Sequence, residues 1–167
     1  IKRLVAIKYG ETFIHGAMAY QGGNPDVKIP ISLIVYLIDT GDRKILVDSG
    51  CETMPGYELF NFSSPADTLR KAGVEPEKIS DVILTHAHHD HFLSVQQYLD
   101  EYSSVVFAAP EGDAELLRKS GCPEPKMLLR EGDVITLGET ELRVMETPGH
   151  TGGGICFVTD REVFTGD

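Results

Sequence analysis

Thr85-His86-Ala87-His88-His89-Asp90-His91 brings four imidazoles and one carboxylate into six consecutive residues, 86–91. The apolar run Val82-Ile83-Leu84 directly precedes it and predicts a strand that ends at the cluster. Histidine and aspartate are ligands that hold zinc, iron or manganese in proteins. If these side chains were buried without a metal, several polar groups would stay unpaired, each at a cost of about 1–3 kcal/mol. The pattern therefore predicts a metal centre at a strand end.

The spacing divides the cluster into two ligand pairs. His86 and His88 are two residues apart, so in an extended segment both project from one face and converge on one metal. Asp90 and His91 form a second pair that faces another metal nearby. His89 stands between the pairs and is expected to face solvent or to lie behind the ligands.

Two residues far along the chain complete these pairs. His150 lies in the turn Thr147-Pro148-Gly149-His150-Thr151, and three imidazoles with one open position are the ligand set of a hydrolytic zinc. Asp167 follows Phe164-Thr165-Gly166 at the end of an expected strand, where its two oxygens can bridge two metals. Two metals about 3.5–4 Å apart hold a shared hydroxide and polarise the bond under attack.

Apolar runs bounded by turn residues predict a sheet core with helices outside it. Ser64 before Pro65 and Asp67 marks a helix start, and apolar residues from Phe92 to Leu99 show helical spacing. Segment 15–30 is rich in glycine and proline and predicts a loop. The expected strands cover 4–8, 31–39, 44–48, 82–85, 105–109, 127–137, 141–146, 155–159 and 163–165, and the expected helices cover 65–71 and 110–119.

Length and composition limit the domain count, the partners and the location. A chain of 167 residues with 41% hydrophobic residues predicts one globular domain over 1–167. The net charge of −11 repels phosphate backbones, so we expect no nucleic-acid partner. No apolar segment approaches the roughly 20 residues that cross a bilayer, and we expect a cytoplasmic protein without a membrane partner. Three widely spaced cysteines, Cys51, Cys122 and Cys156, favour reduced thiols over a disulfide framework.

Four segments of the sequence together resemble the motifs of one protein family. The cluster Thr85 to His91 resembles the H-x-H-x-D-H signature of the metallo-β-lactamase superfamily. Val47-Asp48-Ser49-Gly50 resembles the first motif of that family, Thr147 to Thr151 the third, and Phe164 to Asp167 the fourth, all in family order. The resemblance implies an α+β fold, the four-layer αββα metallo-β-lactamase sandwich, with metals at one edge between its two sheets.

The same resemblance implies roles for individual residues. By motif match the first metal would be held by His86, His88 and His150, the second by Asp90 and His91, and Asp167 would bridge them. Asp48 would support the site from behind as a hydrogen-bond partner. The implied cofactors are two divalent metal ions, zinc by expectation, with manganese or iron as alternatives. A fifth family motif, a further histidine, lies downstream of the bridging aspartate, so we expect a chain truncated after Asp167 with the second half of the sandwich incomplete.

The expected function is a hydrolase that cleaves an ester, lactone or thioester of a small-molecule substrate through a metal-bound hydroxide at a dinuclear site. Asp90 would orient the hydroxide or deliver a proton. Asp167 stands where the main zinc β-lactamases carry cysteine, which disfavours antibiotic hydrolysis. The combination of His91 with Asp167 is similar to glyoxalase II and to acyl-homoserine lactonases, although Phe92-Leu93-Ser94 replaces the glycines that usually follow the signature in glyoxalase II.

Two other functions fit the same residues. A mononuclear iron enzyme resembling the persulfide dioxygenases would use His86, His150 and Asp167. A metal-binding module without catalysis is the other alternative. The sequence carries no signal for the oligomeric state.

Overall fold

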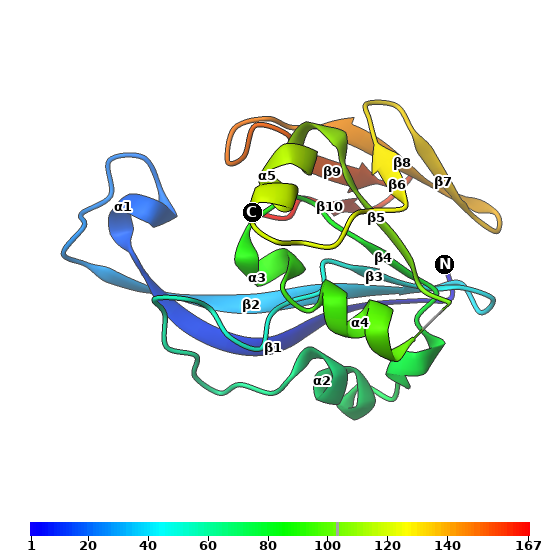
Figure 1. Cartoon of the computed structure of the whole chain (residues 1–167), viewed down its shortest axis with the longest axis horizontal. Coiled ribbons are helices and arrows are strands. Elements are labelled where there is room, and N and C mark those ends of the chain that lie inside the picture. The colour runs from blue at the N-terminus through cyan, green and yellow to red at the C-terminus, as the bar shows by residue number, and fades with distance from the viewer. Residues whose placement is uncertain (103) are drawn as a thin grey trace.

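The computed structural model describes residues 1–102 and 104–167, and its centre is a mixed six-stranded sheet (Figure 1). The strands follow the chain in spatial order: β1 (Arg3–His15), β2 (Lys28–Asp39), β3 (Lys44–Val47), β4 (Asp81–Ile83), β5 (Val106–Pro110) and β6 (Met127–Leu129). β1, β2 and β3 pair antiparallel, whereas β3 to β6 run parallel. The chain segments that follow β3, β4 and β5 therefore leave the sheet at the same edge.

A second, four-stranded antiparallel sheet faces the first. It has the order β10-β9-β8-β7, formed by β7 (Val134–Leu137), β8 (Thr140–Glu146), β9 (Ile155–Val158) and β10 (Val163–Phe164). The backbone N–H of Ile155 donates to the carbonyl oxygen of Thr85 at 2.9 Å, which ties the start of β9 to the segment after β4. This contact joins the two sheets beside the histidine cluster.

Short helices connect the strands and cover the first sheet. They are α1 (Gly16–Ala19), α2 (Pro65–Lys71), α3 (His89–Phe92), α4 (Val95–Glu101) and α5 (Ala114–Lys119), with 3-10 turns η1 (Pro76–Lys78) and η2 (Glu111–Asp113). The expected helix start is confirmed, because the Ser64 hydroxyl accepts from the backbone N–H of Asp67 at 3.1 Å. None of these helices is long and apolar enough to cross a membrane in the part of the chain that the structure describes.

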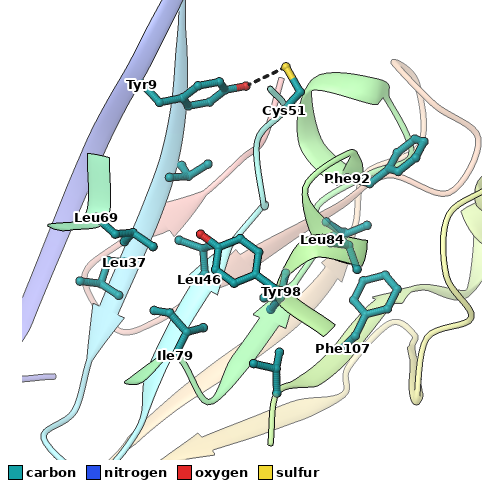
Figure 2. Close-up of a cluster of buried hydrophobic side chains, with 14 of the residues drawn as sticks. Tyr9, Leu37, Leu46, Cys51, Leu69, Ile79, Leu84, Phe92, Tyr98 and Phe107 are labelled. Atoms are coloured by element: carbon teal, nitrogen blue, oxygen red, sulfur yellow. Dashed lines mark hydrogen bonds between the residues drawn. The ribbon is translucent and has the colours of Figure 1, made fainter. Parts of the chain in front are cut away.

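The apolar residues of the central strands alternate between two cores. In β2, Leu33, Val35 and Leu37 face the helices, whereas Ile38 points into the space between the sheets. The helix-side core gathers large side chains from several elements: Tyr9, Leu46, Leu69, Leu84, Phe92, Tyr98 and Phe107 (Figure 2). Strands that are buried on both faces have continuous apolar sequences, because no face needs polar residues. This explains the composition of 31–39 and 44–48.

The inter-sheet core completes the sandwich. Phe157 and Leu142 of the second sheet meet Val47 and Ile83 of the first sheet in it, and all four are buried. The layers are thus helices, first sheet and second sheet. No helix within 1–102 and 104–167 covers the outer face of the second sheet, so three of the four expected layers are present. The expected metallo-β-lactamase sandwich is confirmed in this form.

Three expected boundaries were wrong. Segment 15–30 is not all loop: β1 continues to His15, α1 follows, and β2 begins at Lys28, because β1 and β2 pair along almost their whole length. Figure 1 shows this hairpin and α1 reaching out past the second sheet. The expected strand 127–137 is two strands in different sheets, separated by a turn in which the Asp133 carboxylate accepts from the backbone N–H of Arg130. The helix expected after the cluster begins inside the cluster, as α3 at His89, and is separate from α4.

Candidate metal centre

The expected ligands come from loops at one edge of the sandwich. Asp48 follows β3, His86 and His88 follow β4, and His91 lies in α3, which begins at His89. His150 stands between β8 and β9, and Asp167 follows β10. In Figure 1 the C-terminal residue lies close to α3, so the last residues of the chain meet the cluster of the first sheet. The structure therefore brings together both halves of the expected site.

Three imidazoles converge in a first ligand set. Nε2 of His86 lies 3.1 Å from Nδ1 of His88, and this Nδ1 lies 2.8 Å from Nε2 of His150. Zinc bound tetrahedrally at about 2.0–2.1 Å from each imidazole nitrogen sets such nitrogens roughly 3.3 Å apart. The three donors are thus of the right chemical type, and the two distances lie near the spacing that a tetrahedral ion requires. We conclude that these residues fit zinc.

A second set shares His86 with the first. One donor atom each from His86, His91 and Asp167 lies within 4.8 Å of the others. His91 Nε2 is 3.4 Å from Oδ1 of Asp167 and 3.6 Å from Oδ2 of Asp90. The second carboxylate oxygen of Asp167 lies 3.5 Å from His150 Nε2, so this carboxylate faces both sets. Five of the six expected ligands thus fall into these two sets, and Asp90 lies beside the second set next to His91.

His91 is oriented from behind by a buried carboxylate. Oδ2 of Asp48 lies 2.8 Å from Nδ1 of His91, which leaves Nε2 directed toward Asp90 and Asp167. Asp48 also accepts from the backbone N–H of Thr85 at 2.8 Å and from the Thr85 hydroxyl at 2.9 Å. A carboxylate behind an imidazole fixes its tautomer and ring orientation. Asp48 holds this place with a φ of 61°, a conformation that aspartate and asparagine tolerate better than most residues.

Burial and neighbouring charges decide the protonation of the imidazoles. Burial, with His91 nearby, lowers the pKa of His86 to about 3, and burial also lowers the pKa of His88. Both are therefore neutral near pH 7 and have lone pairs for a metal. Burial lowers the pKa of His91 too, but Asp48, Asp167 and Asp90 outweigh it and raise that pKa well above its ordinary value. A metal at this position has to displace the His91 proton.

The remaining residue of the cluster and two supporting residues have distinct places. His89 is exposed, and its ring lies 5.4 Å from that of Phe92. Thr85 was not among the expected site residues, yet its hydroxyl donates to Asp48 at 2.9 Å and lies 3.1 Å from Nδ1 of His86. Asp113 was not among them either, although it is a buried carboxylate after β5 that contacts two of the ligand loops. The position of Thr85 at a strand end, next to the histidines, could have indicated its role in the site. No feature of the sequence around Asp113 indicated such a role.

A cleft of about 430 Å³ opens beside the ligands. His91, His150 and Asp167 line one end, and the β1–β2 hairpin with α1 supplies the rest of the wall through Ile14, Met18, Ile31, Ser32, Leu33, Ile34 and Tyr36. The side chains of His150 and Asp167 are 46% and 49% exposed, so solvent and a small molecule can reach the ligands from this side. The described lining contains no lysine or arginine.

Comparison with known proteins identifies the class. The family model described as the metallo-beta-lactamase superfamily matches residues 35–167, and the chain belongs to this superfamily. It is 31% identical over 156 residues to the Beta-lactamase-like protein 2 homolog of Drosophila melanogaster, covering 87% of this chain and 50% of that protein. It is 34% identical over 100 residues to a hydroxyacylglutathione hydrolase of Rhodopseudomonas palustris (strain HaA2), covering 58% of this chain and 37% of that protein.

Solved structures agree with this family. The crystal structure of the metallo-beta-lactamase GOB-18 from Elizabethkingia meningoseptica superposes with a TM-score of 0.65 at 26% identity, covering 78% of this chain and 52% of that one. The chain thus spans about half the length of this structure and of the Drosophila relative, and less of the hydrolase.

Proposed function

We propose that the protein is a metal-dependent hydrolase that cleaves an ester, lactone or thioester of a small molecule at a dinuclear centre. The observation that carries this proposal is the pair of ligand sets that meet at His86. A structural zinc site is closed by four protein ligands, whereas a catalytic site keeps an open position. The half-exposed side chains of His150 and Asp167, next to a cleft, support the catalytic type.

In this proposal every expected ligand has a role. The first metal would be held by His86, His88 and His150, the second by Asp90 and His91, and Asp167 would face both. The bound ions would supply Lewis acidity and lower the pKa of bound water toward about 7. The nitrogen-rich first set suits zinc, and manganese or iron suits the more carboxylate-rich second set.

Residues of the chain position the substrate and move the proton. Asp90 is the catalytic carboxylate of the proposal. Its Oδ2 lies 3.6 Å from His91 Nε2 and the residue lines the cleft, where it can orient water and pass a proton to a leaving group. The Tyr9 hydroxyl donates to the backbone carbonyl of Asp90 at 3.0 Å and holds this segment in place. The apolar wall of the hairpin would bind the organic part of the substrate.

The substrate class follows from the charge of the cleft. The Rhodopseudomonas relative is named a hydroxyacylglutathione hydrolase, which supports acyl transfer to water. Glutathione carries carboxylates, and the described cleft lining contains no lysine or arginine to pair with them. Uncharged lactones, esters and thioesters therefore fit the described part of the site better than glutathione thioesters.

Metal content and turnover test the proposal together. The purified protein is analysed by emission spectroscopy and assayed with lactones, neutral thioesters and phosphodiesters after loading with zinc, manganese or iron. Two ions per chain with hydrolysis of a lactone or thioester is the expected result. One iron per chain with oxygen uptake would instead indicate the dioxygenase that uses His86, His150 and Asp167. Bound metal without turnover of any substrate would leave a metal-binding module.

A further inference from the structure

Asp113 is a buried carboxylate that touches both loops of the first ligand set. Its side chain is 2% exposed. Oδ2 accepts from the backbone N–H of Ala87 at 2.9 Å and from the Thr151 hydroxyl at 2.7 Å, and Oδ1 accepts from the backbone N–H of Gly153 at 2.8 Å. Ala87 lies between His86 and His88, and Thr151 follows His150. One carboxylate therefore links the two segments that present the three imidazoles.

The backbone around Asp113 is shaped to allow this link. A Cβ atom on Gly112 would lie 2.7 Å from the Cα of Gly153, and a Cβ on Gly153 would overlap the backbone of Gly112 and Asp113. Two glycines face each other here, and without side chains they let the turn before α5 approach the loop after His150. A close approach of this kind brings the carboxylate within hydrogen-bond distance of both loops.

Hydrogen bonds from these three donors hold the Asp113 carboxylate. No lysine, arginine or histidine forms an ion pair with it in the ranges that the structure describes. Burying a carboxylate is costly unless its oxygens are fully hydrogen-bonded, so a carboxylate at this place is a poor choice for packing alone. A threonine hydroxyl and two amides that all point at it indicate that its geometry is specified.

We propose that Asp113 is a positioning residue of the first metal set, which holds the His86–His88 loop at a fixed distance from the His150 loop. The inference rests on the proposed metal centre. Asp113 acts through the backbone of Ala87 and through Thr151, and does not itself touch the metal or the substrate. Loss of the Asp113 carboxylate separates His88 from His150. It therefore lowers the affinity of the first set for its metal without removing a ligand.

Two pairs of variants test this role. Asp113→Asn keeps the side-chain shape but leaves one acceptor oxygen for three donors. Its matched control is Asp133→Asn, at an exposed aspartate whose carboxylate accepts from the backbone N–H of Arg130. Thr151→Val removes one donor, and Thr151→Ser restores a hydroxyl. Zinc affinity is measured by chelator competition, and the geometry of the first set by the absorption spectrum of the cobalt-substituted protein.

We expect Asp113→Asn to bind zinc about 10–100-fold more weakly than the wild type and to give an altered cobalt spectrum. Thr151→Val should change the zinc affinity and the cobalt spectrum in the same direction as Asp113→Asn. Thr151→Ser and Asp133→Asn should behave as the wild type. If Asp113→Asn does not fold, the threonine pair decides. Folded variants with lower thermal stability but wild-type zinc affinity and cobalt spectrum would overturn the positioning role. A wild type that binds zinc tightly but hydrolyses nothing would overturn the proposed function and leave this role intact.

Discussion

Asp48 Oδ2 lies 2.8 Å from His91 Nδ1, and both side chains are buried, so one ring nitrogen of His91 is held and the other is directed at the second ligand set. Asp48→Asn keeps the side-chain shape and the left-handed backbone, because asparagine tolerates this conformation. The charge that holds His91 is lost. We expect affinity for the second metal to fall by about 10–100-fold, measured by chelator titration. Two ions bound with wild-type affinity would contradict this role.

His86 belongs to both ligand sets, whereas His88 belongs to the first alone. His86→Ala should therefore abolish binding of the first ion and weaken binding of the second, which Asp90, His91 and Asp167 would still hold. His88→Ala should abolish binding of the first ion alone. His89→Ala is the control in the same segment, because this side chain is exposed, and it should keep the full metal content. Emission spectroscopy of the purified variants measures the ion count. Equal losses in the His86 and His88 variants would show that the sets are not shared in this way.

The metal-free protein should lose stability as the pH falls from 7 toward 5. The pKa of His86 is lowered from 6.5 to about 3, and that of His88 is lowered too, so in this range the unfolded chain takes up protons that the folded chain does not. The contribution of His91 to the pH dependence of stability has the opposite sign. Its raised pKa stabilises the fold at low pH, and this stabilisation is lost as the pH rises through the pKa of the folded state.

Urea unfolding of the chelator-treated protein at pH 7, 6 and 5 measures this dependence. His86→Gln removes one of the two groups with lowered pKa, so it should flatten the decline. A His86→Gln variant with an unchanged slope would mean that other groups cause the acid sensitivity.

Cys122 should be unreactive in the folded protein. Burial raises the pKa of its thiol to about 12, so at pH 8 only about one molecule in ten thousand carries the thiolate that attacks an alkylating reagent. Cys122 is half-buried, whereas Cys51 and Cys156 are buried. Iodoacetamide at pH 8 should label the native chain far more slowly than the same chain in urea, followed by mass spectrometry. Rapid labelling of Cys122 in the native protein would show that burial does not suppress the reactivity of its thiol.

Phe157 should contribute strongly to stability through the core between the sheets. Its side chain is 0% exposed, and Phe157→Ala should lower the free energy of unfolding by about 3–5 kcal/mol. Val163 of the neighbouring strand β10 is 55% exposed, so Val163→Ala should change it by less than about 0.5 kcal/mol. Urea unfolding of both variants measures the difference, and similar losses would argue against the sandwich.

The sequence predicted the parts of the site that depend on local pattern. The cluster at His86, the helix cap at Ser64 and the strand ends before Asp48 and Asp167 are each set by a few neighbouring residues, and the structure has them at the expected places. The family motifs then predicted which distant segments would meet. Metal occupancy and the role of each ligand stay predictions.

Features set by tertiary pairing were not predictable in this way. The glycines of segment 15–30 predict a loop, but strand pairing between β1 and β2 extends both strands into it. The expected strand 127–137 runs through the turn at Gly132 and Asp133, and nothing local shows that the chain changes sheets there. Asp113 is one acidic residue in a polar segment, and only the packing of Gly112 against Gly153 reveals its contacts.

The order of the ligands along the chain has a consequence for biosynthesis. His86 to His91 leave the ribosome well before His150 and Asp167, and the two groups meet only after the second sheet docks on the first. The complete ligand sets therefore exist only in molecules whose sheets have joined. Bound metal in a preparation then counts the correctly folded fraction, and supplying metal during refolding traps the docked state by mass action.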